Sequence, residues 1–455
     1  MMGRLTNLFL FWSAWIILPL LIEIIPAIGN FMLLVWKKLH VRKLGQEELQ
    51  FKPTITLIIP VYNSEATLYH CIKSINDSTY PTELIEVLLV DNGSKDNSFA
   101  EFQRAQLTFA ELSMWWISSQ QGKSKALNKA IFNSNGKYVM NIDSDGILEE
   151  TALYNMVAQF ERDGSVDCMT GVILTQPDLV EETEHFFLRQ FRRLEFMEYA
   201  QAFLAGRNFE SQFNSIYTLS GAFSAFRKSV LLKTYLYNTN TICEDTHLSF
   251  QIKSVLNKKI ALCPDALFMV DPIDDLNKFY TQRQRWQIGE LEVSNMFLKN
   301  KMRQPIWKFF TDPTMRLLMM DHTFAFPRLI WYFALAAIGC INYDFGKTLI
   351  ATALIYGLYV LVGLLYYFNI LTFLENFKDI RRYYAGKVGY LLLLPLYNLY
   401  AFFVRIAGII NSIARKSSWK TKTWTAEMEE CEDTLKFDWN WVCEMRRKLI
   451  DLLEE

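Results

Sequence analysis

The segment Lys137–Gly146, KYVMNIDSDG, decides the fold class of this chain. It begins as a short apolar run, Tyr138–Ile142, which predicts a buried strand, and it breaks into Asp143 and Asp145. Because side chains alternate along a strand, the two carboxylates point the same way. Paired carboxylates suit Mg²⁺, which takes one or two oxygen ligands from the protein and the rest from water and phosphates. The segment therefore indicates either a metal-bound diphosphate or a solvated turn.

Alternating strands and helices surround this segment. Strands are predicted at Thr54–Val61, Leu84–Val90 and Met114–Ser118, and helices from Ser64 to about Ile75 and after Gly122. This alternation predicts an α/β fold with a mostly parallel sheet and right-handed crossovers. Ligands of such sheets bind beyond the carboxyl ends of the strands. We therefore expect the functional site at that edge, where three strands deliver polar residues.

Two residues near this edge have both a structural and a functional interpretation. Asp91 opens the turn DNGS, and its carboxylate also suits the N3–H group of a uracil ring. Lys123 starts a helix after Gly122, where a helix N-terminus favours anions and the lysine suits a phosphate. The alternatives are an ordinary βα turn and a solvated surface lysine.

Three downstream segments carry further candidates. His185–Phe209 predicts a long helix that either belongs to the core or lines an acceptor groove. Ile216–Arg227 contains a Gly-Ala turn suited to close backbone approach to a ligand, or else a plain bulge. In the segment CEDTH, which begins at Cys243, the adjacent acids Glu244 and Asp245 either include a general base or form an acid-rich helix start.

The segment QRQRW, residues 282–286, places three functional side chains on one helical face. Gln282, Arg285 and Trp286 are spaced i, i+3 and i+4. Arginine presents a planar fork to phosphate oxygens, and tryptophan presents a flat surface to a sugar ring. We therefore predict phosphate and sugar contacts from this helix.

Composition limits the class of protein. With 455 residues, of which 51% are hydrophobic, the chain has room for one large domain and several membrane segments. The formal net charge of −1 argues against a nucleic-acid partner. The seven cysteines are scattered without metal-ligand spacing, which predicts reduced thiols in a protein that faces the cytosol.

Apolar segments flank the α/β region. Leu5–Trp36 is long enough to cross a bilayer, and no cleavage site follows, so a signal anchor is favoured over a signal peptide. Its basic flank, residues 37–43, predicts that the next domain is cytoplasmic. Further spans are predicted at Phe324–Tyr343 and Thr348–Leu374. After a basic loop, Val388–Ala414 is either a third crossing or a re-entrant or interfacial helix.

Six motifs together resemble one family. TLIIPVYN, VDNGS, QGKSKALN, DSD, CED and QRQRW occur in the order and spacing of the family 2 glycosyltransferases, over residues 53–290. The last motif is similar to the QxxRW of processive membrane synthases, such as cellulose, hyaluronan, chitin and poly-N-acetylglucosamine synthases. The chain also looks like a Gram-positive subgroup associated with an exosortase-like system. The resemblance implies a Rossmann-like GT-A fold, inverting transfer from a nucleotide sugar, and Mg²⁺ or Mn²⁺ as cofactor.

The resemblance also implies a role for each candidate residue. The donor-binding group consists of Tyr62, Glu65 and Asp91 at the nucleobase, Lys123 near the nucleotide and Asp143 at the nucleotide sugar. The group that holds the pyrophosphate and the acceptor end consists of Gln282, Arg285 and Trp286. Asp145 binds the metal, and Asp245 is the general base that deprotonates the acceptor hydroxyl.

Two positions depart from the family pattern. Asn92 stands where many members carry a second Asp, and Cys243 precedes Glu-Asp where Thr is usual. Neither departure removes a residue with an implied role. The predicted organisation is a membrane anchor at residues 1–43, a glycosyltransferase domain at 52–300, interfacial and transmembrane helices at 301–415, and a cytosolic tail at 416–455.

The leading hypothesis is a multi-pass enzyme of the bacterial plasma membrane with a cytoplasmic catalytic domain. It moves a sugar from a nucleotide sugar, a UDP-sugar, to a growing glycan in exopolysaccharide synthesis. The expected partners are this donor, a glycan or lipid-linked acceptor, membrane lipid and an export or accessory protein. One alternative is single-sugar transfer to a lipid or protein acceptor. Another is a non-catalytic nucleotide-sugar-binding scaffold, which we would expect to have lost Asp245, Asp145 or Arg285.

Overall fold

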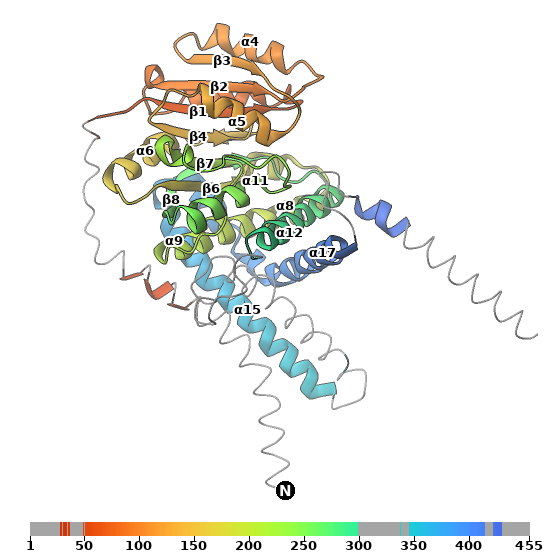
Figure 1. The fold of residues 1–455 in the computed structure, drawn as a ribbon. Helices are drawn as coiled ribbons and strands as arrows, with labels where there is room; N and C mark the ends of the chain where they lie inside the picture. The colour runs from red at the N-terminus through yellow and green to blue at the C-terminus, as the bar shows by residue number, and fades with distance from the viewer. Residues whose placement is uncertain are drawn as a thin grey trace, which may run out of the picture.

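An eight-stranded sheet with the order β3-β2-β1-β4-β7-β6-β8-β5 forms the centre of the chain (Figure 1). The computed structural model describes residues 51–298, 345–414 and 422–429, together with residues 28–29, 31–33, 35–36, 49 and 337. Most of the predicted N-terminal anchor, the predicted span Phe324–Tyr343 and most of the tail lie outside the described residues. The strands are β1 (Ile55–Val61), β2 (Ile85–Asp91), β3 (Ser113–Ser118), β4 (Tyr138–Ile142), β5 (Gly146–Leu148), β6 (Cys168–Thr175), β7 (Phe223–Arg227) and β8 (Ile260–Val270).

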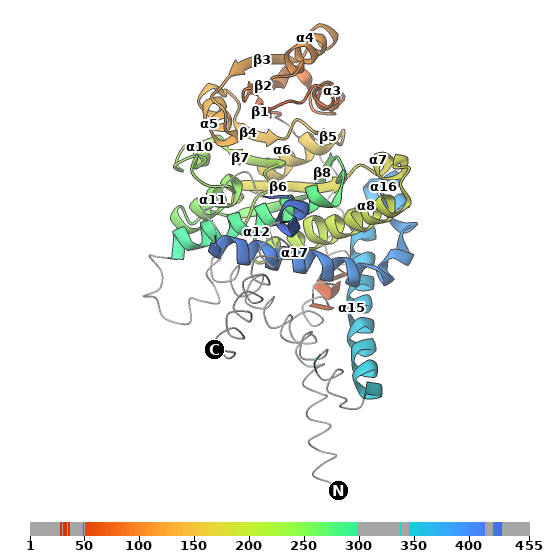
Figure 2. The same ribbon diagram turned by 90° about the vertical axis from the view of Figure 1, so that its right-hand side faces the viewer.

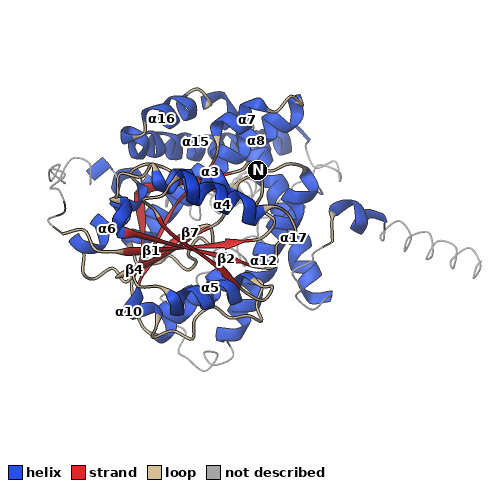
Figure 3. Ribbon diagram, turned by 90° about the horizontal axis from the view of Figure 1, so that it is seen from above, coloured by secondary structure: helices blue, strands red, loops and turns tan. Residues whose placement is uncertain are grey.

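The half of the sheet formed by β3, β2, β1 and β4 is parallel, as predicted. Helices α3 (Leu68–Asn76), α4 (Ser98–Thr108) and α6 (Ala152–Arg162) pack on one face, and α5 (Lys123–Asn133) and α10 (Lys228–Leu231) pack on the other (Figure 3). Strands β1 and β4 are buried along their whole length. Because helices cover both faces of these strands, their sequences are mostly apolar rather than alternating, and the buried Thr56 and Asn141 are the polar exceptions.

The other half of the sheet adds antiparallel strands to the predicted, mostly parallel sheet. Strand β7 runs antiparallel to both β4 and β6, and β5 runs antiparallel to β8, whereas β6 and β8 are parallel. The sheet is therefore mixed. The reason is the entry point of β7, whose first residue, Phe223, pairs with Ile142 at the carboxyl end of β4. The loop before β7 is thereby brought to the edge at which the site was expected.

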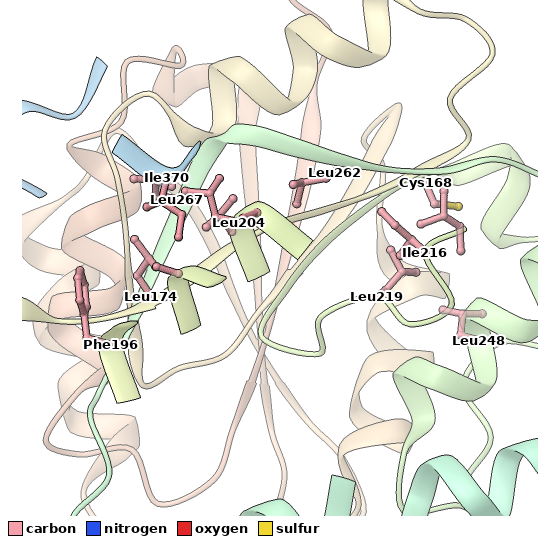
Figure 4. Packing of buried hydrophobic residues seen from close by; sticks show 14 of the residues in the cluster. Cys168, Leu174, Phe196, Leu204, Ile216, Leu219, Leu248, Leu262, Leu267 and Ile370 are labelled. Carbon is pink, nitrogen blue, oxygen red and sulfur yellow. The ribbon is translucent and has the colours of Figure 1, made fainter. Parts of the chain in front are cut away.

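Long helices lie beneath the mixed half. Helix α8 (Phe186–Tyr199) continues through a π-helical stretch, Ala200–Gly206, into α9 (Arg207–Gln212), which confirms the predicted long helix. Leu204 of the π-helical stretch packs in one core with Leu267 of β8 and Ile370 of the C-terminal region (Figure 4). This part of the helix therefore belongs to the core.

The remaining helices of the domain are short except one. They are the 3₁₀ turn Thr82–Leu84, α7 (Pro177–Glu182), α11 (Glu244–Phe250), which leads into the π-helical stretch Gln251–Val255, and the long α12 (Leu276–Leu298). The C-terminal helices are α15 (Phe345–Phe373), α16 (Lys378–Ala385) and α17 (Leu394–Ala414), with 3₁₀ turns at Leu374–Asn376 and Val388–Leu392.

Two described helical segments, Thr348–Asn376 and Leu394–Ser412, are long and apolar enough to cross a membrane. They are arranged differently: α15 projects away from the sheet, whereas α17 lies beside α12 under the domain (Figures 1 and 2). The Tyr397 hydroxyl, near the start of α17, donates to Glu198 of α8 at 3.2 Å. The Asn411 amide, near its end, donates to Gln284 of α12 at 3.4 Å. Both ends of α17 therefore rest on the same domain.

The basic loop between α15 and α17 also docks on the domain. Glu181 of α7 accepts hydrogen bonds from the Tyr383 hydroxyl at 2.8 Å, from the Lys387 ammonium at 2.7 Å and from Arg193. Partial burial raises the pKa of Glu181, but these hydrogen bonds outweigh it and bring the pKa to about 2. This loop therefore lies on the same side of the molecule as the sheet.

Candidate active site

Three loops meet beyond the carboxyl ends of β1, β2 and β4, at the predicted edge. The hydroxyls of Ser64, after β1, and Ser144, after β4, share a hydrogen bond of 2.7 Å. The backbone N–H of Ser64 donates to the hydroxyl of Ser98 at 2.8 Å, which joins the β2–α4 loop to the other two. Ser64 thus connects loops and does not cap the following helix, which begins only at Leu68.

Asp91 and Asn92 shape the loop after β2. Oδ1 of Asp91 accepts the backbone N–H of Ser94 at 2.9 Å, which confirms the predicted βα turn. Gly93 has φ +85°, a conformation that side chains with a Cβ rarely adopt. The buried Asn92 accepts the backbone N–H of Gly122 through Oδ1, and so fixes the start of α5. The departure from the family pattern at Asn92 therefore has a structural role here.

Tyr62 and Glu65 lie in the loop after β1. The Tyr62 residue is 48% exposed at this edge. Glu65 accepts hydrogen bonds from the backbone N–H of Asn97 at 3.2 Å and from its side-chain amide at 2.9 Å. Glu65 therefore braces the β2–α4 loop. The nucleobase contacts implied for Tyr62, Glu65 and Asp91 remain predictions.

Lys123 is the central cation of the site. Its ammonium group forms an ion pair with Asp143 and donates to the carbonyl of Gly221, in the loop before β7, at 3.3 Å. Burial alone lowers the pKa of Lys123, but the carboxylates of Asp143, Glu244 and Asp245 outweigh it and raise the pKa above its usual value. Lys123 is therefore not a solvated surface lysine, and it stays charged.

Asp245 lies in the first turn of α11 and meets the same group of residues. Its Oδ1 accepts the backbone N–H of Thr246 at 2.7 Å. A Cβ atom added to Gly221 would lie 3.0 Å from Oδ2 of Asp245 and 3.7 Å from the Lys123 ammonium, so Gly221 fills the space between them. Burial raises the pKa of Asp245, and the Thr246 and Gly221 backbone and the Lys123 charge offset part of this rise.

Helix α12 is locked to the start of α11. A Cβ atom on Gly289 would lie 2.2 Å from Sγ of Cys243, so only glycine permits this approach. The Cys243 thiol also donates to the carbonyl of Arg285 at 3.8 Å. The residue that departs from the family pattern before Glu-Asp thus holds the helix that carries QRQRW.

The QRQRW segment lies on a helix, as predicted. The Trp286 ring packs edge-on against Phe203, with ring centroids 6.4 Å apart at 86°. The buried Oε1 atom of Gln282 has no hydrogen-bond partner among the described residues. The pyrophosphate and acceptor contacts implied for Gln282, Arg285 and Trp286 remain predictions.

Two functional positions, Arg207 and Gly221, had no assigned role from sequence. Arg207 is buried at the start of α9, and it donates to the hydroxyl of Thr170 at 3.1 Å. The same hydroxyl accepts the backbone N–H of Ser220 at 3.1 Å, so Arg207 and Thr170 support the loop that carries Gly221. An arginine within an aromatic helix and a Gly-Ala turn were the available signals, and neither reveals that the two segments meet.

The carboxylates beyond β4 fit a divalent cation. Asp143 is paired with Lys123, which leaves the solvent-facing Asp145 as the oxygen donor for a metal. Partial desolvation and the nearby Asp143 charge raise the pKa of Asp145 to about 6, and Asp271 adds to this. Among the described residues, no group of three or more His, Cys, Asp or Glu side chains is arranged to hold an ion. A Mg²⁺ or Mn²⁺ ion that takes its other ligands from a diphosphate and water suits such a site.

This edge combines three chemical groups: the buried carboxylate of Asp245, the fixed cation of Lys123 and the carboxylate of Asp145, an oxygen donor of the kind that a metal binds. Burial raises the pKa of Asp245, a direction that increases the basicity of its carboxylate. Lys123, together with a metal bound at Asp145, would suit a phosphate-bearing group.

The comparison with protein families agrees with this chemistry. Residues 56–234 match the family described as Glycosyl transferase family 2. They form a glycosyl transferase family 2 domain. The domain contains six of the ten candidate residues, whereas the other four, Asp245 and the three on the QRQRW helix, lie beyond its matched range.

Curated relatives of the glycosyl transferase family 2 domain extend the match. The chain is 26% identical over 254 residues to a poly-beta-1,6-N-acetyl-D-glucosamine synthase of Staphylococcus epidermidis, covering 55% of this chain and 58% of that protein. It is 25% identical over 248 residues to the synthase of the same name from Staphylococcus aureus (strain COL), covering 52% and 55%. The chain thus matches less than two thirds of the length of these relatives.

A solved structure shows the same fold. The mannosyltransferase PcManGT from Pyrobaculum calidifontis, in complex with GDP-Man and Mn²⁺, has a TM-score of 0.58 and 17% identity to this chain. The match covers 89% of this chain and 99% of that one. The glycosyl transferase family 2 domain therefore has a GT-A-like, Rossmann-like fold with a mixed sheet.

Proposed function

We propose that this chain is a membrane enzyme that transfers a sugar, with inversion, from a UDP-sugar to a growing glycan at the cytoplasmic face of a bacterial plasma membrane. The observation that carries the proposal is the convergence of Lys123, Asp143 and Asp245 around Gly221. Poly-beta-1,6-N-acetyl-D-glucosamine synthases among the relatives support a glycan as the acceptor. The exosortase-associated subgroup remains a prediction.

The donor would lie across the ends of β1, β2 and β4. Tyr62, Glu65 and Asp91 line the nucleobase end, and Lys123 with Asp143 lies near the sugar and diphosphate. Asp145 would hold Mg²⁺ or Mn²⁺, which supplies charge neutralisation to the diphosphate when bound. Asp143 orients Lys123, and Lys123 keeps a positive charge beside the leaving group.

Asp245 would act on the acceptor. Its carboxylate takes the proton of an acceptor hydroxyl as the hydroxyl oxygen forms a bond to the anomeric carbon of the donor sugar. The bond from that carbon to the diphosphate oxygen breaks, and the electron pair leaves with the nucleoside diphosphate. Because attack and departure occur on opposite sides of the carbon, the configuration inverts. Gln282, Arg285 and Trp286 would hold the pyrophosphate and the acceptor end.

Membrane attachment follows the arrangement of the C-terminal helices. Helix α15 is the proposed crossing. The contacts of both ends of α17 with α8 and α12 support the interfacial alternative over a third crossing. The docking of the basic loop through Glu181 supports a catalytic domain on the same, cytoplasmic side as this loop. Labelling of a cysteine introduced at exposed Lys378, with an impermeant reagent on sealed vesicles, tests the side.

The test of function uses the full chain in lipid with Mg²⁺ or Mn²⁺ and a panel of nucleotide sugars. Released nucleoside diphosphate and product length are measured for the wild type and for Asp245→Asn. The matched control is Asp167→Asn, which removes another buried aspartate, paired with Lys258 at 3.3 Å before β6. We expect one UDP-sugar to turn over, long products, and a loss of about 10²–10⁴-fold in Asp245→Asn alone.

Other outcomes decide between the alternatives. Short products lost in Asp245→Asn indicate single-sugar transfer to a lipid or protein. Donor binding without turnover, unchanged in the variant, indicates a nucleotide-sugar-binding scaffold. Transport of polymer into sealed vesicles by the purified protein alone would exclude the need for an export partner.

A further inference from the structure

Arg283, the second residue of QRQRW, is an arginine in an unusual place. Its side chain is 2% exposed, and it forms an ion pair with Glu198 of α8, itself 13% exposed. Removing charges from water is costly, and such a pair is often no more stabilising than well-packed apolar residues. A buried arginine on the same helix as the implied acceptor residues therefore calls for a role beyond stability.

The aromatic surroundings of Arg283 indicate that role. Its guanidinium carbon lies 4.6 Å from the ring centroid of Trp286, 5.0 Å from that of Phe279 and 5.5 Å from that of Tyr199. Its Nε atom has no hydrogen-bond acceptor among the described residues. The guanidinium thus lies over three aromatic rings as well as against Glu198, and these distances lie within the range of cation–π attraction.

Trp286 is held on a second side as well. Phe203, in the π-helical stretch after α8, meets the Trp286 ring edge-on. The ring of Trp286 therefore has two neighbours that restrict its rotation, Arg283 on its own helix and Phe203 across from it. A π-helical stretch is a frequent local feature of functional sites, because its extra residue redirects side chains.

Glu198, the partner of Arg283, also contacts α17 on the proposed membrane side of the domain. Glu198 also accepts a hydrogen bond from the Tyr397 hydroxyl of α17 at 3.2 Å. Glu198 thus joins three helices: it lies on α8, it pairs with Arg283 of α12 and it bonds to α17. Through this group, the orientation of Trp286 is tied to the helix that packs along the underside of the domain.

We infer that Arg283 is a positioning residue for acceptor binding: anchored by Glu198, it holds the ring of Trp286 in the orientation that receives the acceptor sugar. The identity of the ligand, a sugar ring, rests on the proposed function. The contact between Arg283 and Trp286 rests on the geometry alone. Arg283 itself touches no reacting atom. Any cation at this position would neutralise Glu195 and Glu198, the acids of α8. The role inferred for Arg283 is a different one, because it depends on the contact with the Trp286 ring.

The central variant is Arg283→Met/Glu198→Gln, which removes both charges and keeps side chains of similar size. The matched control is Arg192→Met/Asp274→Asn, which removes another arginine–carboxylate pair, 3.8 Å apart, between α8 and the loop before α12. Arg283→Lys is the conservative variant, because it keeps the charge opposite Glu198 but lacks the planar face.

The first measurement does not depend on activity. The full chain in lipid is labelled with 5-fluorotryptophan, and the ¹⁹F resonance of Trp286 is identified among the 12 tryptophans by Trp286→Phe. We expect this resonance to shift and narrow in Arg283→Met/Glu198→Gln, to do so partly in Arg283→Lys, and to stay unchanged in the control. An unchanged Trp286 resonance in the first variant, with an unaltered thermal midpoint, overturns the inference.

The second measurement is the kinetic consequence. With the donor that the wild type uses, we expect Arg283→Met/Glu198→Gln to raise the acceptor KM about tenfold and to leave the donor KM within about twofold. Equal acceptor KM values in the variant and the wild type also overturn the inference. If the wild type transfers no sugar, the proposed function fails, and the ¹⁹F result still decides whether Arg283 holds Trp286.

Discussion

The two halves of the sheet are held together by different kinds of contact. In the parallel half, β3-β2-β1-β4, short polar contacts join neighbouring loops, such as the 2.7 Å bond between Ser64 and Ser144. In the mixed half, β7-β6-β8-β5 with α8, α12 and α17, buried arginines join elements far apart in sequence, and close glycine contacts, which Gly136 also makes in the parallel half, join further elements. The pairing of Arg283 with Glu198 and the contact of Gly289 with Cys243 are examples.

This difference separates two tasks. The parallel half builds the proposed donor site from strand ends, where turn residues adjust the loops with little effect on the core. The mixed half builds the proposed acceptor side from helices, where one buried contact positions several elements. Substitutions in the mixed half should therefore change stability and activity together, whereas those at the strand ends should act mainly on donor use. The site itself lies where Lys123, Gly221 and Asp245 join the halves.

The largest effect is expected where the halves meet. Lys123→Met leaves the carboxylates of Asp143, Glu244 and Asp245 without their shared cation. Because the side chains of Lys123 and Asp143 are 20% and 30% exposed, we expect the loss of stability to stay below the ~3–5 kcal/mol that breaking a fully buried pair costs. We expect donor turnover to fall by about 10²–10³-fold, because the leaving group loses its fixed positive charge. Turnover and thermal unfolding are measured beside Lys125→Met, an exposed lysine of the same helix. Equal turnover in both variants contradicts the central role of Lys123.

A steric substitution tests the link between α11 and α12. Gly289→Ala brings a Cβ atom against the Cys243 side chain, and overpacking of this kind costs about 1–3 kcal/mol. We expect lower thermal stability and about tenfold lower turnover, because α12 must move away from Asp245. Gly289→Ala/Cys243→Ala should recover part of both losses, since Sγ is removed. In the control, Gly357→Ala on α15, no atom lies within 4 Å of the new Cβ.

A pH series tests the titration of Glu195, a buried acid of α8 in the mixed half. Burial raises the pKa of Glu195 to about 7, and the Ile273 N–H, Arg283 and Arg192 only partly offset this, while Glu198 adds to it. Because the pKa of Glu195 in the folded state exceeds its ordinary value of 4.5, the bound proton contributes stability that is fully present below pH ~4.5 and is lost as the pH rises through ~7. The difference is on the order of 3 kcal/mol.

Glu195→Gln should therefore gain stability relative to the wild type between pH 5 and about 7, and the gain should level off above that pH. Thermal midpoints measured from pH 5 to about 8.5 follow this difference. The exposed Glu184→Gln, just before α8, is the control. Curves for the wild type and Glu195→Gln that run parallel across the whole range contradict the shifted titration.

The smallest effect is expected in the parallel half. Asn92→Asp keeps an oxygen that accepts the N–H of Gly122, so we expect turnover within about threefold of the wild type. Asn92→Leu leaves that N–H without its acceptor, which costs about 1–3 kcal/mol and should weaken donor binding. Nucleotide affinity measured by calorimetry separates the two variants. A large loss in Asn92→Asp would mean that the amide group has a further partner.

The sequence determined the parallel half of this protein in detail. Apolar runs bounded by turn residues predicted β1, β2, β3 and β4 to within one residue at each end. In β1, β2 and β4 the run is strongly apolar because burial on both faces disfavours polar side chains. Asp91, Lys123, Asp143 and Asp145 followed directly, since their position relative to a strand or helix end is a local property. The helix that carries QRQRW was predicted for the same reason.

Only the tertiary structure decided the mixed half. The direction of β7, the place of Gly221 between Lys123 and Asp245, and the contact of Gly289 with Cys243 depend on segments that are distant in sequence. A local pattern carries no information on which distant element will be packed against it. The apolar segment of α17 shows the limit: its composition suits a crossing, but its hydrogen bonds to α8 and α12 place it along the domain. Hydrophobic burial has no direction, so packing partners determine where such a helix lies.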